Sequence, residues 1–194
     1  MVLSSSSSLT SRKNAGRHNG WKRDATRFNE QQRARILAAI AVATRGATQK
    51  WYGTEKEAAL AIHNTDIGKI SKAHDIEIGV QFYRSPIDPT RVYAGTAVTD
   101  FRNYDVNPVS GSQPPWVYLP YGGWLHTHGR GAGGGQNSFS DFDYSWTKQI
   151  GGGVNAYLSA PNGRLYMFDY DRWSISRTHR DQEVEFVSEI TDGP

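Results

Sequence analysis

Two histidines separated by a single residue are the clearest chemical signal in this chain. His126 and His128 flank Thr127 in the segment WLHTH. In an extended segment alternate side chains point to the same face, so both imidazoles can approach one metal ion. A carboxylate is expected as a third ligand, and Ser140-x-x-Asp143, at the start of a predicted helix, offers Asp143. Three protein ligands leave a fourth position for water, which is the arrangement of a catalytic zinc site.

A second register of serine and carboxylate is also present. Ser138-x-x-Asp141 has the same spacing and would make Asp141 the ligand. We prefer Ser140 with Asp143, because Phe139 then precedes the helix cap as an apolar staple and Asp143 falls in the first helical turn. Such a motif alone is most often only a capping box, so the metal-site prediction depends on its combination with the two histidines.

The order of these motifs resembles that of the JAMM (JAB/MPN) metalloproteases, whose signature is a glutamate, then His-Ser/Thr-His, then Ser-x-x-Asp. More narrowly, the run HTHGRG…FSDFD…AYLSAPNGRLYMF is similar to JAB-like domains at the C-terminal ends of bacterial polymorphic toxins such as Rhs-type effectors. The resemblance covers about residues 54–176. Two features depart from the family pattern: the eleven residues 129–139 exceed its usual spacing, and Gly129 stands where proline is common.

The resemblance implies a zinc-dependent hydrolase of peptide or isopeptide bonds. The family's upstream glutamate, its general base, corresponds to Glu77 in the segment HDIEIGV. His126, His128 and Asp143 would hold Zn²⁺, and Ser140 would donate a hydrogen bond to the developing oxyanion. The toxin context implies an effector that is secreted or delivered into a target cell, acts on a protein or peptide, and is neutralised by a cognate immunity protein.

Two other function classes are compatible with the same residues. One is a catalytically inactive JAB-like binding module that uses the basic N-terminal region as an adaptor, and metal content discriminates it from the enzyme. The other is a metal-dependent nuclease with a basic arm, although an HNH-like arrangement is absent. The segment 129–135 holds five glycines, and Arg130 within it is a candidate to hold a substrate carboxylate or carbonyl.

Composition excludes several other classes of protein. The 194 residues contain no cysteine, which rules out disulfides, thiolate zinc fingers and a cysteine nucleophile. No apolar run approaches the ~20 residues needed to cross a bilayer, and the start MVLSSSSSLTSRKN lacks an apolar signal core. We therefore expect no membrane span, and a cytoplasmic location if the chain is not exported by another route.

Charge divides the chain into three predicted parts. Residues 1–50 hold ten lysines and arginines against two acidic residues, a net charge of +8, whereas residues 51–194 hold 12 against 17, a net charge of −5. Residues 1–26 are predicted to be a flexible Ser-rich and basic tail, residues 27–50 a basic helix packed on the body or on a partner, and residues 51–194 the JAB-like catalytic domain. The basic side chains permit a weaker nucleic-acid interpretation. Its candidate phosphate contacts are Arg12, Lys13, Arg17, Lys22, Arg23, Arg27, Arg33 and Arg35, with Trp21 and Phe28 for base stacking.

The elements that must position the candidate site form an α+β pattern, with a single mixed or antiparallel sheet flanked by helices. The resemblance adds the JAB/MPN architecture, which is similar to that of cytidine deaminases. A capping box at Thr54 opens a helix that either breaks near Asn64 or continues to about His74; His63 and His74 are expected to be ordinary surface histidines. Helix 141–150 follows the histidines. Strands are predicted over 77–84, 91–99, 154–160, 164–170 and 173–176, with the tail from Thr178 a short helix or loose. Residues 101–120 form a long loop with an extended piece at 116–119, expected to line a substrate groove.

Overall fold

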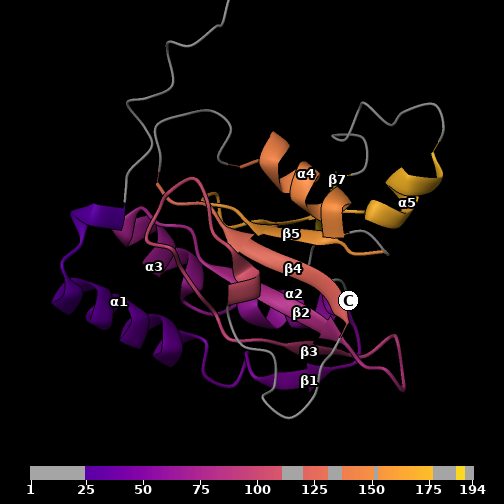
Figure 1. The fold of residues 1–194 in the computed structure, drawn as a ribbon, viewed down its shortest axis with the longest axis horizontal. Coiled ribbons are helices and arrows are strands. Elements are labelled where there is room, and N and C mark those ends of the chain that lie inside the picture. Colours follow the sequence, from indigo (N-terminus) through magenta and orange to yellow (C-terminus); the bar gives the residue numbers. More distant parts are fainter. Residues whose placement is uncertain (1–24, 111–119, 131–136, 151–152, 177–186, 191–194) are drawn as a thin grey trace, which may run out of the picture.

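A mixed β-sheet is the centre of the fold (Figure 1). The computed structural model describes residues 25–110, 120–130, 137–150, 153–176 and 187–190. Within these residues the sheet has seven strands in the order β1-β3-β2-β4-β5-β6-β7. The strands are β1 (Lys50–Tyr52), β2 (Gly79–Arg84), β3 (Val92–Ala94), β4 (Tyr121–Thr127), β5 (Ala156–Ser159), β6 (Leu165–Phe168) and β7 (Val187–Ile190). Neighbouring strands are antiparallel except β4 and β5, which are parallel.

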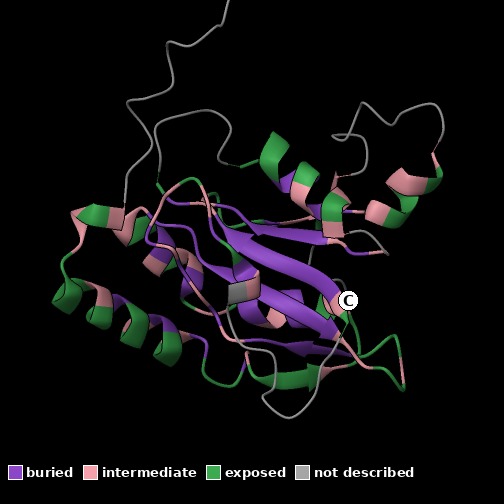
Figure 2. Cartoon of the chain, viewed as in Figure 1, coloured by how far each residue is buried: buried purple, intermediate pink, exposed green. Residues whose placement is uncertain are grey.

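Helices cover both faces of this sheet, because successive side chains of each strand point to opposite faces and both sets are largely apolar. The described helices are α1 (Glu30–Ala43), α2 (Glu55–His63), α3 (Ile67–His74), α4 (Asp141–Ile150) and α5 (Tyr170–Ile175), with short 3-10 turns η1 (Ala25–Arg27) and η2 (Pro108–Ser110). Helices α1–α3 share one core with Phe82 and Leu125. Helices α4 and α5 share the other with Trp124 and Phe168. The central strands are buried and the outer helix faces exposed (Figure 2). The predicted α+β class with one mixed sheet flanked by helices is confirmed.

The predicted basic helix packs on the body of the protein. Asn29 caps α1 in a reciprocal box with Gln32, and the helix buries Ile36 and Ile40 in the core. Before it, Arg27 donates to the carbonyls of His74 and Asp75 at the end of α3. The predicted tail, with Trp21 and the basic residues that precede Arg27, lies outside the described residues apart from residues 25 and 26. Among the helices that the structure describes, none has the length and hydropathy that crossing a bilayer requires.

The chain passes from β4 through α4 to β5, and this crossover matters most for the site. Parallel neighbours such as β4 and β5 require a connection that returns along the sheet, which α4 provides. A helix that follows a strand in this way begins near the strand's C-terminal end. The first turn of α4, which carries Asp143, is therefore brought back to the end of β4, which carries His126.

Several predicted element boundaries are wrong. The first strand was expected from Glu77 but begins at Gly79, since the backbone N–H of Glu77 donates instead to the carbonyl of Arg102 at 2.6 Å. The second predicted strand, 91–99, is shorter, because only Val92–Ala94 pairs continuously. Residues 173–176 were expected as a strand, but Asp169 accepts from the N–H of Arg172 and caps the helix α5.

The break in the helix after Thr54 is confirmed, whereas the two edge strands of the sheet were not predicted. The helix after Thr54 breaks at Asn64, one of the two expected alternatives. The edge strands β1 and β7 were not predicted, because each is short and is specified by its neighbour in the sheet. His63 is half-buried, with its Nδ1 2.8 Å from Ser159 Oγ. The extended piece expected at 116–119 and the tail over 178–186 lie outside the described residues.

Candidate metal centre

The two histidines lie at the C-terminal end of β4 with their imidazoles turned toward each other. His126 is the penultimate residue of the strand and is fully buried, whereas His128 follows the strand and is half-buried. Their Nε2 atoms are 3.0 Å apart. Trp124, two residues earlier on the same face, stacks on His126 with ring centroids 4.5 Å apart. The stacked indole removes water from one side of the imidazole and holds its orientation.

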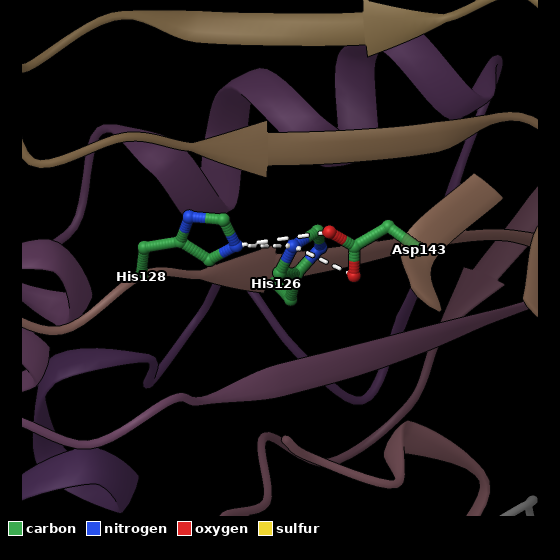
Figure 3. A group of neighbouring side chains, drawn as sticks. All are labelled: His126, His128 and Asp143. Carbon is green, nitrogen blue, oxygen red and sulfur yellow. Dashed lines mark hydrogen bonds and ion pairs between the residues drawn. The ribbon is translucent and has the colours of Figure 1, made fainter. Parts of the chain in front are cut away.

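Asp143 completes the group from the first turn of α4 (Figure 3). Its Oδ1 lies 3.3 Å from His126 Nε2, and its Oδ2 lies 3.8 Å from His128 Nε2. The same carboxylate accepts hydrogen bonds from the N–H and hydroxyl of Ser140 at 2.6 and 2.8 Å. The Ser140 hydroxyl in turn accepts from the N–H of Asp143. The capping box is therefore present, and it orients the carboxylate toward the imidazoles.

These three side chains fit a metal ion. Zinc–ligand bonds of about 2.0–2.2 Å in tetrahedral geometry place neighbouring ligand atoms roughly 3.3–3.6 Å apart. The two imidazole nitrogens are 3.0 Å apart, and Asp143 approaches them through different oxygens, Oδ1 at 3.3 Å from His126 and Oδ2 at 3.8 Å from His128. One ligand atom from each residue lies within 4.8 Å of the other two, so one ion can lie between them. Two nitrogen ligands and one oxygen ligand are also a donor set common to catalytic zinc sites. The group can bind a metal ion, and three ligands leave further coordination positions for small molecules.

Burial and the mutual attraction of the groups shift their pKa values. Burial lowers the pKa of His126, against the opposing attraction of Asp143. Burial alone would raise the pKa of Asp143. The attraction of His126 and hydrogen bonds from both imidazoles outweigh it and hold this pKa well below its usual range. The centre thus offers two imidazoles and one carboxylate anion.

A second carboxylate, that of Glu77, lies beside His128. Its Oε1 is 3.9 Å from His128 Nε2, and the residue is 7% exposed. Burial raises the pKa of Glu77 to about 8; His128 lowers it, while the nearby charges of Asp143 and Asp105 raise it further. A carboxylate whose pKa lies near neutrality can both accept and return a proton.

The remaining predicted residues lie around this group. Ser140 is exposed, and its hydroxyl is directed to Asp143. Asp141 and Ser138, the alternative register, are exposed, and Asp141 is not part of the group. The structure therefore brings Asp143, rather than Asp141, to the imidazoles. Arg130 is exposed two residues after His128, and most of the glycine-rich segment after it lies outside the described residues.

Gly129 fixes the direction of the chain after His128. A Cβ at this position would lie 2.9 Å from the carbonyl carbon of Asp75 and 3.0 Å from the N atom of Ile76. Both are backbone atoms, so glycine is required for the close approach. Asp75 itself has φ 53°, and its carboxylate accepts from Asn103 and pairs with Arg27. A larger residue at position 129 would therefore displace the backbone at residues 75 and 76.

Part of the predicted long loop forms one side of the site. A Cβ on Gly79, the first residue of β2, would lie 3.1 Å from Pro108 and 3.2 Å from Val106. Residues 106–108 therefore lie directly on the sheet face that carries His126, since Gly79 pairs with His126. The contribution of Trp124 to the site was not predicted, because tryptophan does not signal a metal centre. The close backbone approach at Gly129 agrees with the prediction for the glycine-rich segment that begins there. Comparisons of the chain with protein-family models, curated proteins and solved structures found no match.

Proposed function

We propose that this protein is a zinc-dependent hydrolase of peptide or isopeptide bonds, of the JAMM type. The observation that carries the proposal is the convergence of His126, His128 and Asp143, with the buried carboxylate of Glu77 3.9 Å from the second imidazole. A structural zinc site would be expected to use four protein ligands, whereas only three converge among the described residues. The extra carboxylate is the group that hydrolysis requires.

The proposed mechanism assigns one task to each side chain. His126, His128 and Asp143 hold the ion, which when bound lowers the pKa of water and polarises a carbonyl group. Glu77 Oε1 accepts a proton from the attacking water and returns it to the leaving amine. The Ser140 hydroxyl, whose single proton is donated to Asp143 in the metal-free protein, turns from that carboxylate to donate to the oxyanion that develops on the substrate carbonyl. The stacked Trp124 and the buried walls strengthen these electrostatic interactions by excluding solvent.

The biological context is proposed from the sequence resemblance alone. A JAB/MPN architecture agrees with a mixed sheet covered by helices on both faces. The similarity to toxin-associated JAB-like domains adds the proposal of an effector, secreted or delivered into a target cell and bound by an immunity protein. A protein or peptide is the proposed substrate in either case.

Elemental analysis of the wild-type protein, purified without chelator, tests the metal centre. About one zinc per chain is expected, lost in His128→Ala and retained in Asp141→Asn, a matched control that removes an exposed carboxylate from the same helical turn. No stoichiometric metal after zinc is offered would refute the enzyme and favour a binding module. Cleavage of nucleic acid that a chelator abolishes would favour the nuclease instead.

The catalytic assignment requires a second variant. Glu77→Gln should retain zinc but lose cleavage of a peptide joined to a lysine side chain, because the amide cannot accept the proton. A zinc-loaded Glu77→Gln protein that still cleaves at the wild-type rate would exclude Glu77 as the base.

A further inference from the structure

Two buried hydroxyls lie directly behind the metal centre. Thr127 sits between the two histidines, and since strand side chains alternate, its side chain points to the opposite face of the sheet, beneath α3. There its Oγ1 donates to Ser71 Oγ at 2.8 Å and accepts from the N–H of Ile78 at 3.0 Å. Thr127 and Ser71 are both 0% exposed.

The hydroxyl of Ser71 continues the chain of hydrogen bonds. Its Oγ lies 2.6 Å from the carbonyl oxygen of Ile76 and 3.1 Å from that of His128, so one proton is shared between two acceptors. The two side chains therefore bind the backbone of Ile76 and Ile78, on either side of Glu77, and the backbone of His128. All of these contacts lie on the face of the sheet opposite the imidazoles.

We propose that Ser71 and Thr127 form a hydroxyl clamp that sets the distance between the Glu77 carboxylate and the His128 imidazole. Glu77 precedes β2, and the backbone hydrogen bonds around it run from Glu77 to Arg102 and from Thr127 to Ile78. The two hydroxyls add the contacts that tie both sides of Glu77 to the backbone of His128. The two hydroxyls act as positioning groups and do not touch the substrate or the ion. As an account of catalysis the inference rests on the proposed function, whereas the clamp itself is a property of the metal-free protein.

Four variants of the full chain separate this role from general packing. Thr127→Val keeps the shape of the side chain and removes the hydroxyl, whereas Thr127→Ser keeps the hydroxyl. Ser71→Ala removes the second hydroxyl with little change of volume. Thr44→Val is the matched control, because Thr44 is 2% exposed and its hydroxyl donates to Ile40 in α1, away from the site.

Amide hydrogen exchange of the metal-free proteins tests the clamp directly. Thr127→Val and Ser71→Ala should each speed exchange in residues 76–78 by about tenfold, the effect of one lost hydrogen bond, with β2 unchanged. Thr127→Ser should restore wild-type protection, and Thr44→Val should leave residues 76–78 unaffected. Wild-type exchange in both Thr127→Val and Ser71→Ala, or equal effects of Thr127→Ser and Thr127→Val, would overturn the clamp.

Binding of Co²⁺, whose visible absorption reports ligand geometry, tests the link to the metal centre. The band of the wild-type protein should shift in Thr127→Val and return in Thr127→Ser, an effect that a purely structural role would not produce. An identical band in all variants would overturn the positioning role. Failure of the wild-type protein to bind Co²⁺ or Zn²⁺ would instead overturn the proposed function and, with it, any catalytic role of the clamp, while the exchange experiment still decides whether the clamp exists.

Discussion

Asp143 has two roles that a pair of substitutions can separate. Its carboxylate caps α4 through Ser140 and faces both imidazoles. Asp143→Asn keeps an oxygen that can accept from Ser140 but removes the charge that attracts a cation. Asp143→Ala removes both. If Asp143 is only a capping residue, zinc should raise the Tm of Asp143→Asn by as much as it raises the Tm of the wild-type protein.

The expected changes in the free energy of unfolding and in Tm follow from these contacts. Without metal, Asp143→Ala should lower the free energy of unfolding by about 1–2 kcal/mol through loss of the cap, and Asp143→Asn by less. Zinc at a hundred times its Kd stabilises the wild-type protein by about 2.7 kcal/mol, which for this chain length raises Tm by roughly 5–10 °C. Loss of one charged ligand should weaken zinc binding by about a hundredfold. At the same zinc concentration the ion would then stabilise the variant by only about 0.4 kcal/mol and raise its Tm by roughly 1 °C.

Thermal unfolding with chelator and with zinc is the appropriate assay, with Asp141→Asn as the control because that carboxylate is exposed in the same turn. The reasoning predicts a zinc-dependent shift in the wild-type and Asp141→Asn proteins and almost none in either Asp143 variant. A shift in Asp143→Asn as large as that of the wild-type protein would show that Asp143 is not a ligand and that capping is its role.

Three further perturbations test other parts of the site. The pKa of Glu77 is about 8 in the folded metal-free chain and about 4.3 in the unfolded chain. Between about pH 4.3 and about pH 8 the folded chain therefore retains a proton that the unfolded chain has released. The contribution of this group to stability is lost as the pH rises through that window. In chelator, Glu77→Gln should match the wild-type protein near pH 4 and exceed its denaturant midpoint at pH 8.5; equal midpoints at both pH values would contradict the assignment. Gly129→Ala places a Cβ against the backbone of Asp75, so it should lower the free energy of unfolding by about 1–3 kcal/mol and weaken zinc binding. An unchanged Tm would contradict this steric argument. Thr147→Val removes the hydroxyl that accepts from the buried Nε1 of Trp124, so it should lower the free energy of unfolding by about 1–3 kcal/mol. Denaturant unfolding followed by tryptophan fluorescence measures this change. A decrease of less than half that size would indicate that water replaces the hydroxyl.

The elements whose signals are local were predicted from the sequence. The predicted capping boxes at Thr54 and Ser140 depend on residues three positions apart. The box at Ser140 is complete, whereas Thr54 accepts from the N–H of Glu57 but the Glu57 carboxylate accepts from Gly53 instead of Thr54. The alternation that puts His126 and His128 on one side of an extended segment depends only on backbone geometry. The α5 helix differs from the predicted strand because its apolar residues fit both structures and the cap at Asp169 favours the helix.

The amino-acid sequence by itself determined which chemical groups are available, where helices with local caps begin, and that two imidazoles share one face. Only the tertiary structure decided the distances between groups far apart in the chain. The crossover of α4 between parallel strands brings Asp143 to His126, and burial beside His128 raises the pKa of Glu77. The contact of Ser71 with Thr127 joins residues 56 positions apart. Such contacts depend on how sheet and helices pack together, because pairing and burial are properties of the whole fold and no local pattern encodes them.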